Sequence, residues 1–375
     1  MDEFTADPPP DAPPPATVPV IAAPPPAPRF AWWKRALYYL RFEHLLLVGF
    51  VLWAANAFKQ DWYTRLDNGL NPDKINAVGL SWVAAPAVVM LAIILLQQIA
   101  AGFQSGRARG LRVNAVSTVE KLVVTAADWL PFGLFLSIYL MFRSKLVQDY
   151  QGHNCDAVLA AWEELIFRGH ASLWTEKIAS VPLTFTMQVF YSGHIYFTTP
   201  ATAILCYMKD KRLFRALMLG MTVVAVVGAI GYTRIPGAGP GRFLHDLYAG
   251  NLPTTRMGEV LAYTLESARA PDDVFPSLHV GVSLVCLLAV RRTWRWAFWL
   301  MLPWILGNWI STVYLRYHYI IDCVAGAVLA VAAFYASLAM VRGEEWLKRR
   351  FAPPVVAVFT PPPAQPATPA ATTPA

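Results

Sequence analysis

The chain has 375 residues, of which 56% are hydrophobic and only 15% are charged. Soluble domains usually carry about a quarter charged residues, so this composition argues against an ordinary soluble protein and predicts an integral membrane protein. The formal net charge is +7, but the basic residues are dispersed among short loops, which indicates orientation signals rather than a nucleic-acid-binding surface. The 14 tryptophans fit the same interpretation, because Trp gathers at membrane interfaces.

Both ends of the chain are low in complexity. Residues 1–30 and about 352–375 are rich in Pro, Ala and Thr and have almost no large apolar side chains. Such segments cannot bury enough surface to offset the entropy lost on ordering, so we expect disordered tails. The first apolar run begins only after Arg29, so no signal peptide is expected at the N-terminus.

The apolar segments predict an all-α polytopic bundle of about eight spans, since a span needs roughly 20 mostly apolar residues. Among the four cysteines, Cys155 lies in a loop and the other three lie in spans, in a spacing that suits neither a disulfide framework nor a zinc site. The expected spans are about 37–58, 78–101, 120–142, 186–208, 214–234, 277–291, 294–315 and 319–341.

Lysines and arginines cluster at every second boundary between these spans. Basic residues mark the cytoplasmic side of a membrane protein, so both termini are expected in the cytoplasm, with a bacterial inner membrane as the expected location. The loops near 59–77, 143–185, 235–276 and 316–318 then lie on the extracytoplasmic side. The basic clusters fall within 29–35, 107–121, 209–215, 291–295 and 342–350.

Two polar islands interrupt the apolar C-terminal third, and ionisable residues in such surroundings are functional candidates by default. Ser277 and His279 begin the sixth span on the outer face. The chain returns to Arg316 and His318 about 37 residues later, the length of two short spans and a tight turn. Asp322 follows His318 by one helical turn and shares its face. We therefore expect both islands to form one outward-facing site at the lipid boundary.

This set of side chains suits phosphoryl transfer. An arginine holds phosphate oxygens as a charge-assisted fork, and a histidine oriented by a carboxylate is a competent nucleophile. A second histidine can protonate the departing oxygen. A metal site is the less favoured alternative because no HExxH helix or His/Cys cluster occurs. Neither a metal nor a cofactor is therefore expected.

At these residues the sequence resembles the type 2 phosphatidic acid phosphatase (PAP2) superfamily. The run Pro276-Ser-Leu-His279 is similar to that family's PSGH-type motif, and Ser311 through His318 to Asp322 is similar to its last motif. The branch that contains the inositol phosphorylceramide synthases is closer. This chain is similar to that branch in four motifs. They are PSLH at 276–279, ST at 311–312, HYxxDxxxG at 318–326 and a Tyr/Pro-rich element at 232–240. The resemblance covers about residues 150–341.

The resemblance implies a role for each matching residue. His318 would form a phosphohistidine and Asp322 would orient it, although a carboxylate there could simply cap the last helix. His279 would be the general acid and base. Ser277 would contact the phosphate, with capping of the helix start as the competing role.

Two departures from the family pattern concern the phosphate. The family's arginine six residues before the nucleophile is Thr312 here, and its KxxxxxxRP motif has no counterpart. Other cations must then hold the phosphate. Arg316 is the first candidate, with membrane-interface snorkelling as its alternative. Arg234 is second and Arg242 is third.

Three further residues and one segment are additional candidates for a functional or structural role. His194 and Tyr232 are candidate cavity-lining residues, and His194 could instead bond a neighbouring helix. Nothing in the sequence decides the role of Asp128. The segment 156–174 suits an outer-face interfacial helix, with a lid over the site as the sharper hypothesis.

The resemblance implies a lipid phosphotransferase with a six-helix catalytic core, acting on membrane phospholipid and on a lipid hydroxyl such as ceramide or diacylglycerol. A lipid phosphate or polyprenyl pyrophosphate phosphatase is the alternative. A transporter or silent scaffold is a remote one, because no internal repeat is found. The expected division is a Pro-rich tail (1–30), N-terminal spans (31–145), a PAP2-like domain (146–342) and a basic, then Pro/Ala-rich cytoplasmic tail (343–375). Nothing predicts an oligomeric state.

Overall fold

The computed structural model describes residues 40–57, 125, 128–133, 154–268 and 273–351. Within these ranges the chain is all-helical apart from one isolated bridge between Gly237 and Asp273, which confirms the all-α class. The elements are α2 (Phe42–Ala57), α6 (Asp156–Phe167), α7 (Ala171–Glu176), α8 (Val181–Gly193), η1 (His194–Thr198), α9 (Thr199–Lys209), α10 (Lys211–Arg234), α11 (Pro240–Phe243), η2 (His245–Leu247), α12 (Arg256–Ala268), α13 (Leu278–Thr293), α14 (Arg295–Tyr314) and α15 (Ile320–Phe351).

Two of the described helices, α10 and α15, are long and apolar enough to cross a membrane by length and composition. The bounds of α10, α13 and α14 agree with the expected spans within a few residues. In contrast, α15 continues through residues 342–350 to Phe351, so the basic segment that was expected to begin the C-terminal tail is helical. The expected span 78–101 and most of 120–142 lie outside the described residues, and the count of eight spans stays a prediction.

The fourth expected span is a helix with one widened turn. Helix α8 continues through the π-helical turn η1 into α9. Pro200 lacks an N–H and its ring crowds the preceding turn, which is a known cause of such irregularity. The hydroxyls of Thr198 and Thr199 donate to the carbonyl oxygen of His194 at 2.9 and 3.1 Å. The turn is therefore held by local bonds, and His194 lies at its start.

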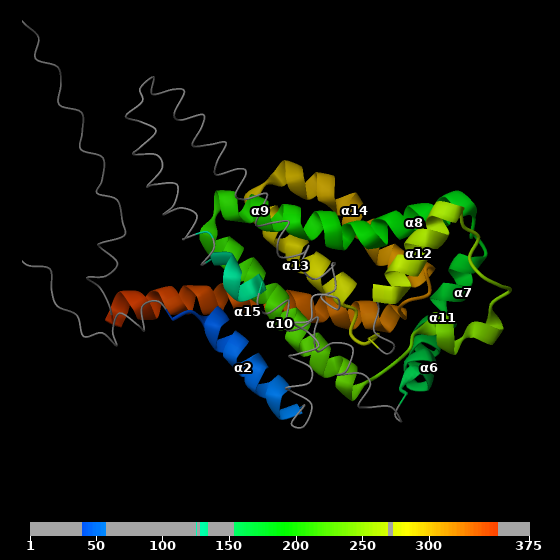
Figure 1. Ribbon diagram of the computed structural model, residues 1–375, viewed down its shortest axis with the longest axis horizontal. Coiled ribbons are helices and arrows are strands. Elements are labelled where there is room, and N and C mark those ends of the chain that lie inside the picture. The colour runs from blue at the N-terminus through cyan, green and yellow to red at the C-terminus, as the bar shows by residue number, and fades with distance from the viewer. Residues whose placement is uncertain (1–39, 58–124, 126–127, 134–153, 269–272, 352–375) are drawn as a thin grey trace, which may run out of the picture.

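Helices α10, α13 and α15 pack against one another in the core of the bundle (Figure 1). Leu217, Val224, Cys286 and Ala330 are fully buried at this junction, and burial of such apolar side chains stabilises the packing. The short helices α6, α7, α11 and α12 gather at one end of the bundle (Figure 1). That end carries the loops on which both polar islands lie.

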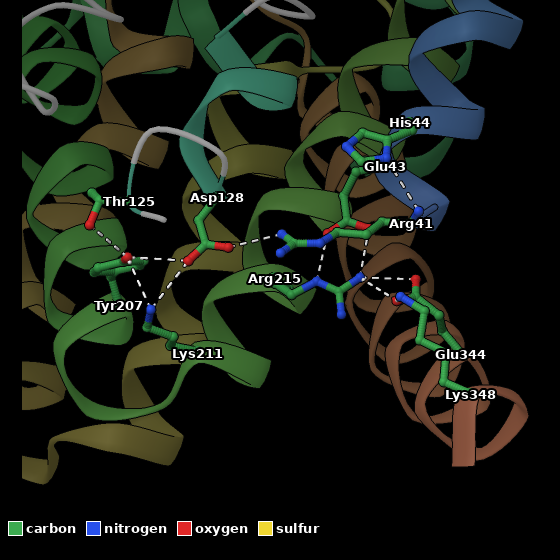
Figure 2. A network of polar contacts seen from close by, with 10 residues as sticks. All are labelled: Arg41, Glu43, His44, Thr125, Asp128, Tyr207, Lys211, Arg215, Glu344 and Lys348. Carbon is green, nitrogen blue, oxygen red and sulfur yellow. Dashed lines mark hydrogen bonds and ion pairs between the residues drawn. The ribbon is translucent and has the colours of Figure 1, made fainter. Parts of the chain in front are cut away.

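A charged cluster lies at the other end and ties α2 to the core (Figure 2). Arg215 of α10 forms a fork with Glu43 of α2 at 2.7 and 2.9 Å, and it also contacts Glu344 of α15 at 2.9 Å. Its side chain is only 14% exposed. One arginine therefore joins three helices that are far apart in the sequence.

Asp128, whose role the sequence left undecided, belongs to the same network (Figure 2). Its carboxylate accepts from Arg41 at 2.9 Å and from Lys211 at 3.3 Å, and the Tyr207 hydroxyl donates to it at 3.2 Å. The side chain is 7% exposed, so these partners balance a largely buried charge. This supports a structural role for Asp128.

We expect Arg215→Ala to lower the stability of the purified protein in detergent. The substitution leaves Glu43 and Glu344 without their shared cation, and breaking a buried ion pair costs roughly 3 kcal/mol. The thermal unfolding midpoint measures the loss. Arg212→Ala is the matched control, because the Arg212 side chain is 62% exposed where it pairs with Glu345. Equal midpoints for the two variants would contradict the role given to Arg215.

Candidate functional site

The structure brings the two polar islands together. His279 lies in the first turn of α13 and His318 lies in the loop before α15, with ring centroids 6.0 Å apart. Asp322, in the first turn of α15, has its Oδ2 3.6 Å from Nδ1 of His318, which is an ion-pair distance. Asp322 is fully buried and His318 is 4% exposed. The same oxygen, Oδ2 of Asp322, accepts from the backbone N–H of Tyr319 at 2.9 Å. The imidazole of His318 therefore lies close to a buried carboxylate and to a second histidine.

The histidines meet because the first turns of α13 and α15 touch. The backbone N–H of Ser277 donates to the carbonyl oxygen of Asp322 at 3.0 Å. Gly326 makes this approach feasible, since a Cβ there would overlap the carbonyl oxygen of Ser277. The Ser277 hydroxyl makes no cap bond to α13, and it is buried without a partner among the described residues. The capping alternative is therefore not realised.

Thr312, at the position of the family's arginine, organises the loop that holds His318. Its carbonyl oxygen accepts from the backbone N–H groups of Tyr317 and His318, both at 3.0 Å. Its hydroxyl donates to the carbonyl oxygen of Trp309 at 2.7 Å. Thr312 is fully buried. The residue that replaces the expected cation therefore shapes the loop backbone.

A buried carboxylate on α6 joins two outer loops. Asp156 accepts from the backbone N–H groups of Ala238 and Gly239 at 2.6 and 3.0 Å and from the Tyr319 hydroxyl at 3.0 Å. Gly239 has φ +90°, and a Cβ there would lie 2.6 Å from the carbonyl oxygen of Tyr317. The Tyr/Pro-rich loop thus lies directly on the loop of the second polar island.

Glu163, two turns further along α6, fixes the start of α15. Its Oε1 accepts from the backbone N–H of Ile320 at 2.9 Å, and its Oε2 lies 3.2 Å from Nδ1 of His170. The opposite face of α6 is exposed and apolar, with Trp162 and Leu165, as expected for an interfacial helix. The inner face is tied to the site by carboxylates, which favours a fixed brace over a movable lid.

The guanidinium of Arg316 contacts the outer segments around α7. It donates to Glu176 Oε1 at 2.7 Å and to the carbonyl oxygen of Gly250 at 2.8 Å, and it stacks 3.7 Å above the Tyr248 ring. Burial raises the pKa of the Tyr248 phenol above its ordinary value, so the ring stays uncharged. Of the three guanidinium nitrogens of Arg316, two have these partners, and the third, Nε, is buried without a partner among the described residues. Phosphate binding by Arg316 would require exchange with Glu176.

The remaining predicted residues lie at different depths. Arg234 ends α10 and Arg242 lies in α11, and both are exposed. Tyr232 is buried and packs against Leu278, next to His279 in the sequence. His194 is buried, and its ring centroid lies 5.8 Å from that of His279. Among the predicted cavity residues, His194 thus has the direct contact.

Sequence reasoning missed two side chains that contact His279. Tyr191 stacks on its ring with centroids 4.1 Å apart, and Asn308 Nδ2 donates to its carbonyl oxygen at 3.3 Å. The signal for Tyr191 was its spacing, three residues before His194 and therefore on the same helix face. Asn308 could have been noticed as the lone amide side chain in an apolar helix. The described residues contain no group of three or more His, Cys, Asp or Glu that could hold a metal.

Comparison with known proteins agrees with the motifs. Residues 158–336 match the family model described as "PAP2 superfamily". An inositol phosphorylceramide synthase from Candida albicans is 25% identical over 247 residues, which cover 59% of this chain and 50% of that protein. The chain thus spans about half the length of this curated relative. No solved structure matches. The resemblance read from the motifs is confirmed.

We expect Gly326→Ala to separate the first turns of α13 and α15. The added methyl group would meet the Ser277 backbone, which cannot move without displacing His279. The thermal midpoint in detergent should fall by several degrees, consistent with overpacking costs of about 1–3 kcal/mol. Gly343→Ala in the same helix meets nothing within 4 Å and should match or exceed the parent. A Gly326→Ala protein as stable as Gly343→Ala would refute the contact.

Proposed function

Because residues 158–336 match the family model of the PAP2 superfamily, we propose that this chain transfers a phosphoinositol-like headgroup from a membrane phospholipid to a lipid hydroxyl such as ceramide. The kind of function, a lipid phosphotransferase or phosphatase, follows from the family and from the similar inositol phosphorylceramide synthase. The observation that carries the proposal is the histidine pair, with centroids 6.0 Å apart and a buried carboxylate beside His318. A phosphoryl group between the two rings would be within reach of both.

The first step would form a phosphohistidine. A ring nitrogen of His318 attacks phosphorus, the new N–P bond replaces the bond from phosphorus to the leaving lipid oxygen, and that oxygen takes a proton from His279. Asp322, close to Nδ1 of His318, stabilises the positive charge that the imidazole gains. Ser277, whose hydroxyl is buried without a partner among the described residues, would contact a phosphate oxygen.

The second step would return the enzyme to its starting state. The acceptor hydroxyl gives its proton to His279, its oxygen bonds to phosphorus and the N–P bond to His318 breaks. Water in place of the lipid hydroxyl would make the enzyme a phosphatase, which is the second candidate function. The 4% exposure of His318 favours an acceptor delivered by the lipid phase, since bulk water has little access.

The proposed location is a membrane with the site on its extracytoplasmic face. The basic clusters at 209–215 and 342–350 lie where α10 begins and where α15 ends, and the histidines lie where α13 and α15 begin, at the opposite end of the bundle (Figure 1). Basic residues favour the cytoplasmic side. The outer loops and α6 would then lie at the outer lipid boundary.

The direct test uses purified protein in detergent with inositol-labelled phosphatidylinositol, with and without ceramide. A labelled sphingolipid is the expected product. His318→Ala and His279→Ala should each lower its rate by at least about a hundredfold. His245→Ala is the control, because the His245 side chain is 79% exposed on η2. A fully active His318→Ala protein would refute the mechanism. Free phosphate from labelled phosphatidic acid or polyprenyl pyrophosphate, without any sphingolipid product, would favour the phosphatase.

A second prediction concerns the phosphate-binding cation. If Arg316 leaves Glu176 to bind phosphate, Arg316→Gln should raise the KM for the phospholipid about tenfold, the value of one charge-assisted contact. Glu176→Gln should lower that KM, because it removes the competing carboxylate. Arg234→Gln and Arg242→Gln, measured alongside, test the second and third candidates. An unchanged KM in Arg316→Gln, with a lowered thermal midpoint, would assign Arg316 a structural role only.

A further inference from the structure

A row of buried polar side chains runs along one face of α8 and η1. Helix α8 contains no charged residue. Their spacing of three or four residues places them on a common face. The row consists of Thr184, Gln188, Tyr191, His194 and Thr198, all of which are buried.

Helix packing accounts for part of this row. The hydroxyls of Thr184 and Tyr314 bond to each other at 2.8 Å between α8 and α14, and Thr198 donates to the carbonyl oxygen of His194 at 2.9 Å. Such bonds between and within apolar helices are ordinary packing. These threonines therefore need no ligand.

Two amide oxygens are not accounted for in this way. Gln188 Oε1 and Asn308 Oδ1 are buried and have no hydrogen-bond partner among the described residues. Gln188 is 3% exposed and Asn308 is 0% exposed. The Thr254 hydroxyl is also buried without a partner in the described part of the chain. Both this hydroxyl and Gln188 Oε1 lie close to Gly258. Burying an unpaired acceptor is costly, so a ligand that donates hydrogen bonds is expected there.

Asn308 and two members of the row contact the reacting histidine. Tyr191 and His194, on the same face as Gln188, contact the His279 ring at centroid distances of 4.1 and 5.8 Å. Asn308 contacts His279 from α14 through its amide nitrogen. Irregular π-helical turns such as η1 occur frequently at functional sites. The row thus leads directly to the group that would exchange protons with the acceptor.

We propose that Gln188, His194 and Asn308 bind the acceptor lipid of the reaction, and that they recognise a neutral lipid with hydrogen-bond donors besides its reacting hydroxyl. The inference rests on the proposed function and specifies its acceptor. A phosphate-bearing donor needs cations, and α8 has none. Each unpaired acceptor oxygen instead suits a neutral donor group, such as the N–H or a hydroxyl of ceramide. The reacting hydroxyl gives its proton to His279, so diacylglycerol, which has no other donor, would leave both amide oxygens unpaired.

The test measures transfer and hydrolysis together in the full-length protein, with labelled phosphatidylinositol as donor. The acceptor is either ceramide or a diacylglycerol whose acyl chains differ from those of the donor, so that the product of transfer can be separated from the substrate. In Gln188→Met and His194→Gln, we expect the KM for ceramide to rise at least tenfold and the transfer-to-hydrolysis ratio to fall by a similar factor. The preference for ceramide over diacylglycerol should shrink in Gln188→Met. Ser337→Ala is the matched control, because Ser337 Oγ on α15 is also buried without a partner in the described residues. Its ratio should stay within twofold of the parent.

The outcomes separate this inference from the function on which it rests. Equal losses of transfer and hydrolysis in both variants, with an unchanged KM for ceramide, would overturn the acceptor site while leaving the phosphotransferase intact. A parent protein that releases neither product would overturn the proposed function and this inference with it. Thermal midpoints identify a variant that fails to fold, and the other variant then decides.

Discussion

The hydrogen bond from the Ser277 backbone N–H to the Asp322 carbonyl oxygen is the contact on which the candidate site depends. It joins the first turns of α13 and α15, whose motif residues are more than thirty positions apart in the sequence. Gly326 permits it, because any side chain at that position would strike the Ser277 backbone. His279 and His318 face each other as a consequence. Packing therefore explains why the second motif ends in a glycine, Gly326, just as the proposed chemistry explains its histidine, His318.

The outer loops are held by carboxylates. Asp156 and Glu163, both buried on α6, accept from backbone groups of the Tyr/Pro-rich loop and of the α15 start. Each bond satisfies a backbone donor that would otherwise be buried and unpaired, a loss of about 1–3 kcal/mol per group. Arg316 adds a third tie through Glu176. The end of the bundle that would meet the lipid headgroups is thus ordered by polar contacts, while the middle of the bundle is packed by apolar side chains.

Hydropathy and the motifs predicted the α10, α13 and α14 bounds, the all-α class and the meeting of His279 with His318, because each depends on local pattern or on span length. They did not predict that α15 extends to Phe351, because charged residues after a span are compatible both with an irregular tail and with a helix that continues. They also missed the Glu176 partner of Arg316 and the brace formed by Asp156. Such contacts join segments far apart in the chain, and no periodicity records them.

The central claim is that His318 carries the phospho-group between the two lipids. The measurement that tests it most directly is a rapid acid-free quench of the protein with phosphorus-labelled phosphatidylinositol in the absence of acceptor, followed by peptide mapping. The account predicts an acid-labile, base-stable label on the peptide that contains His318, which disappears when ceramide is added before the quench. Turnover of the phospholipid to product with no label on that peptide would contradict it.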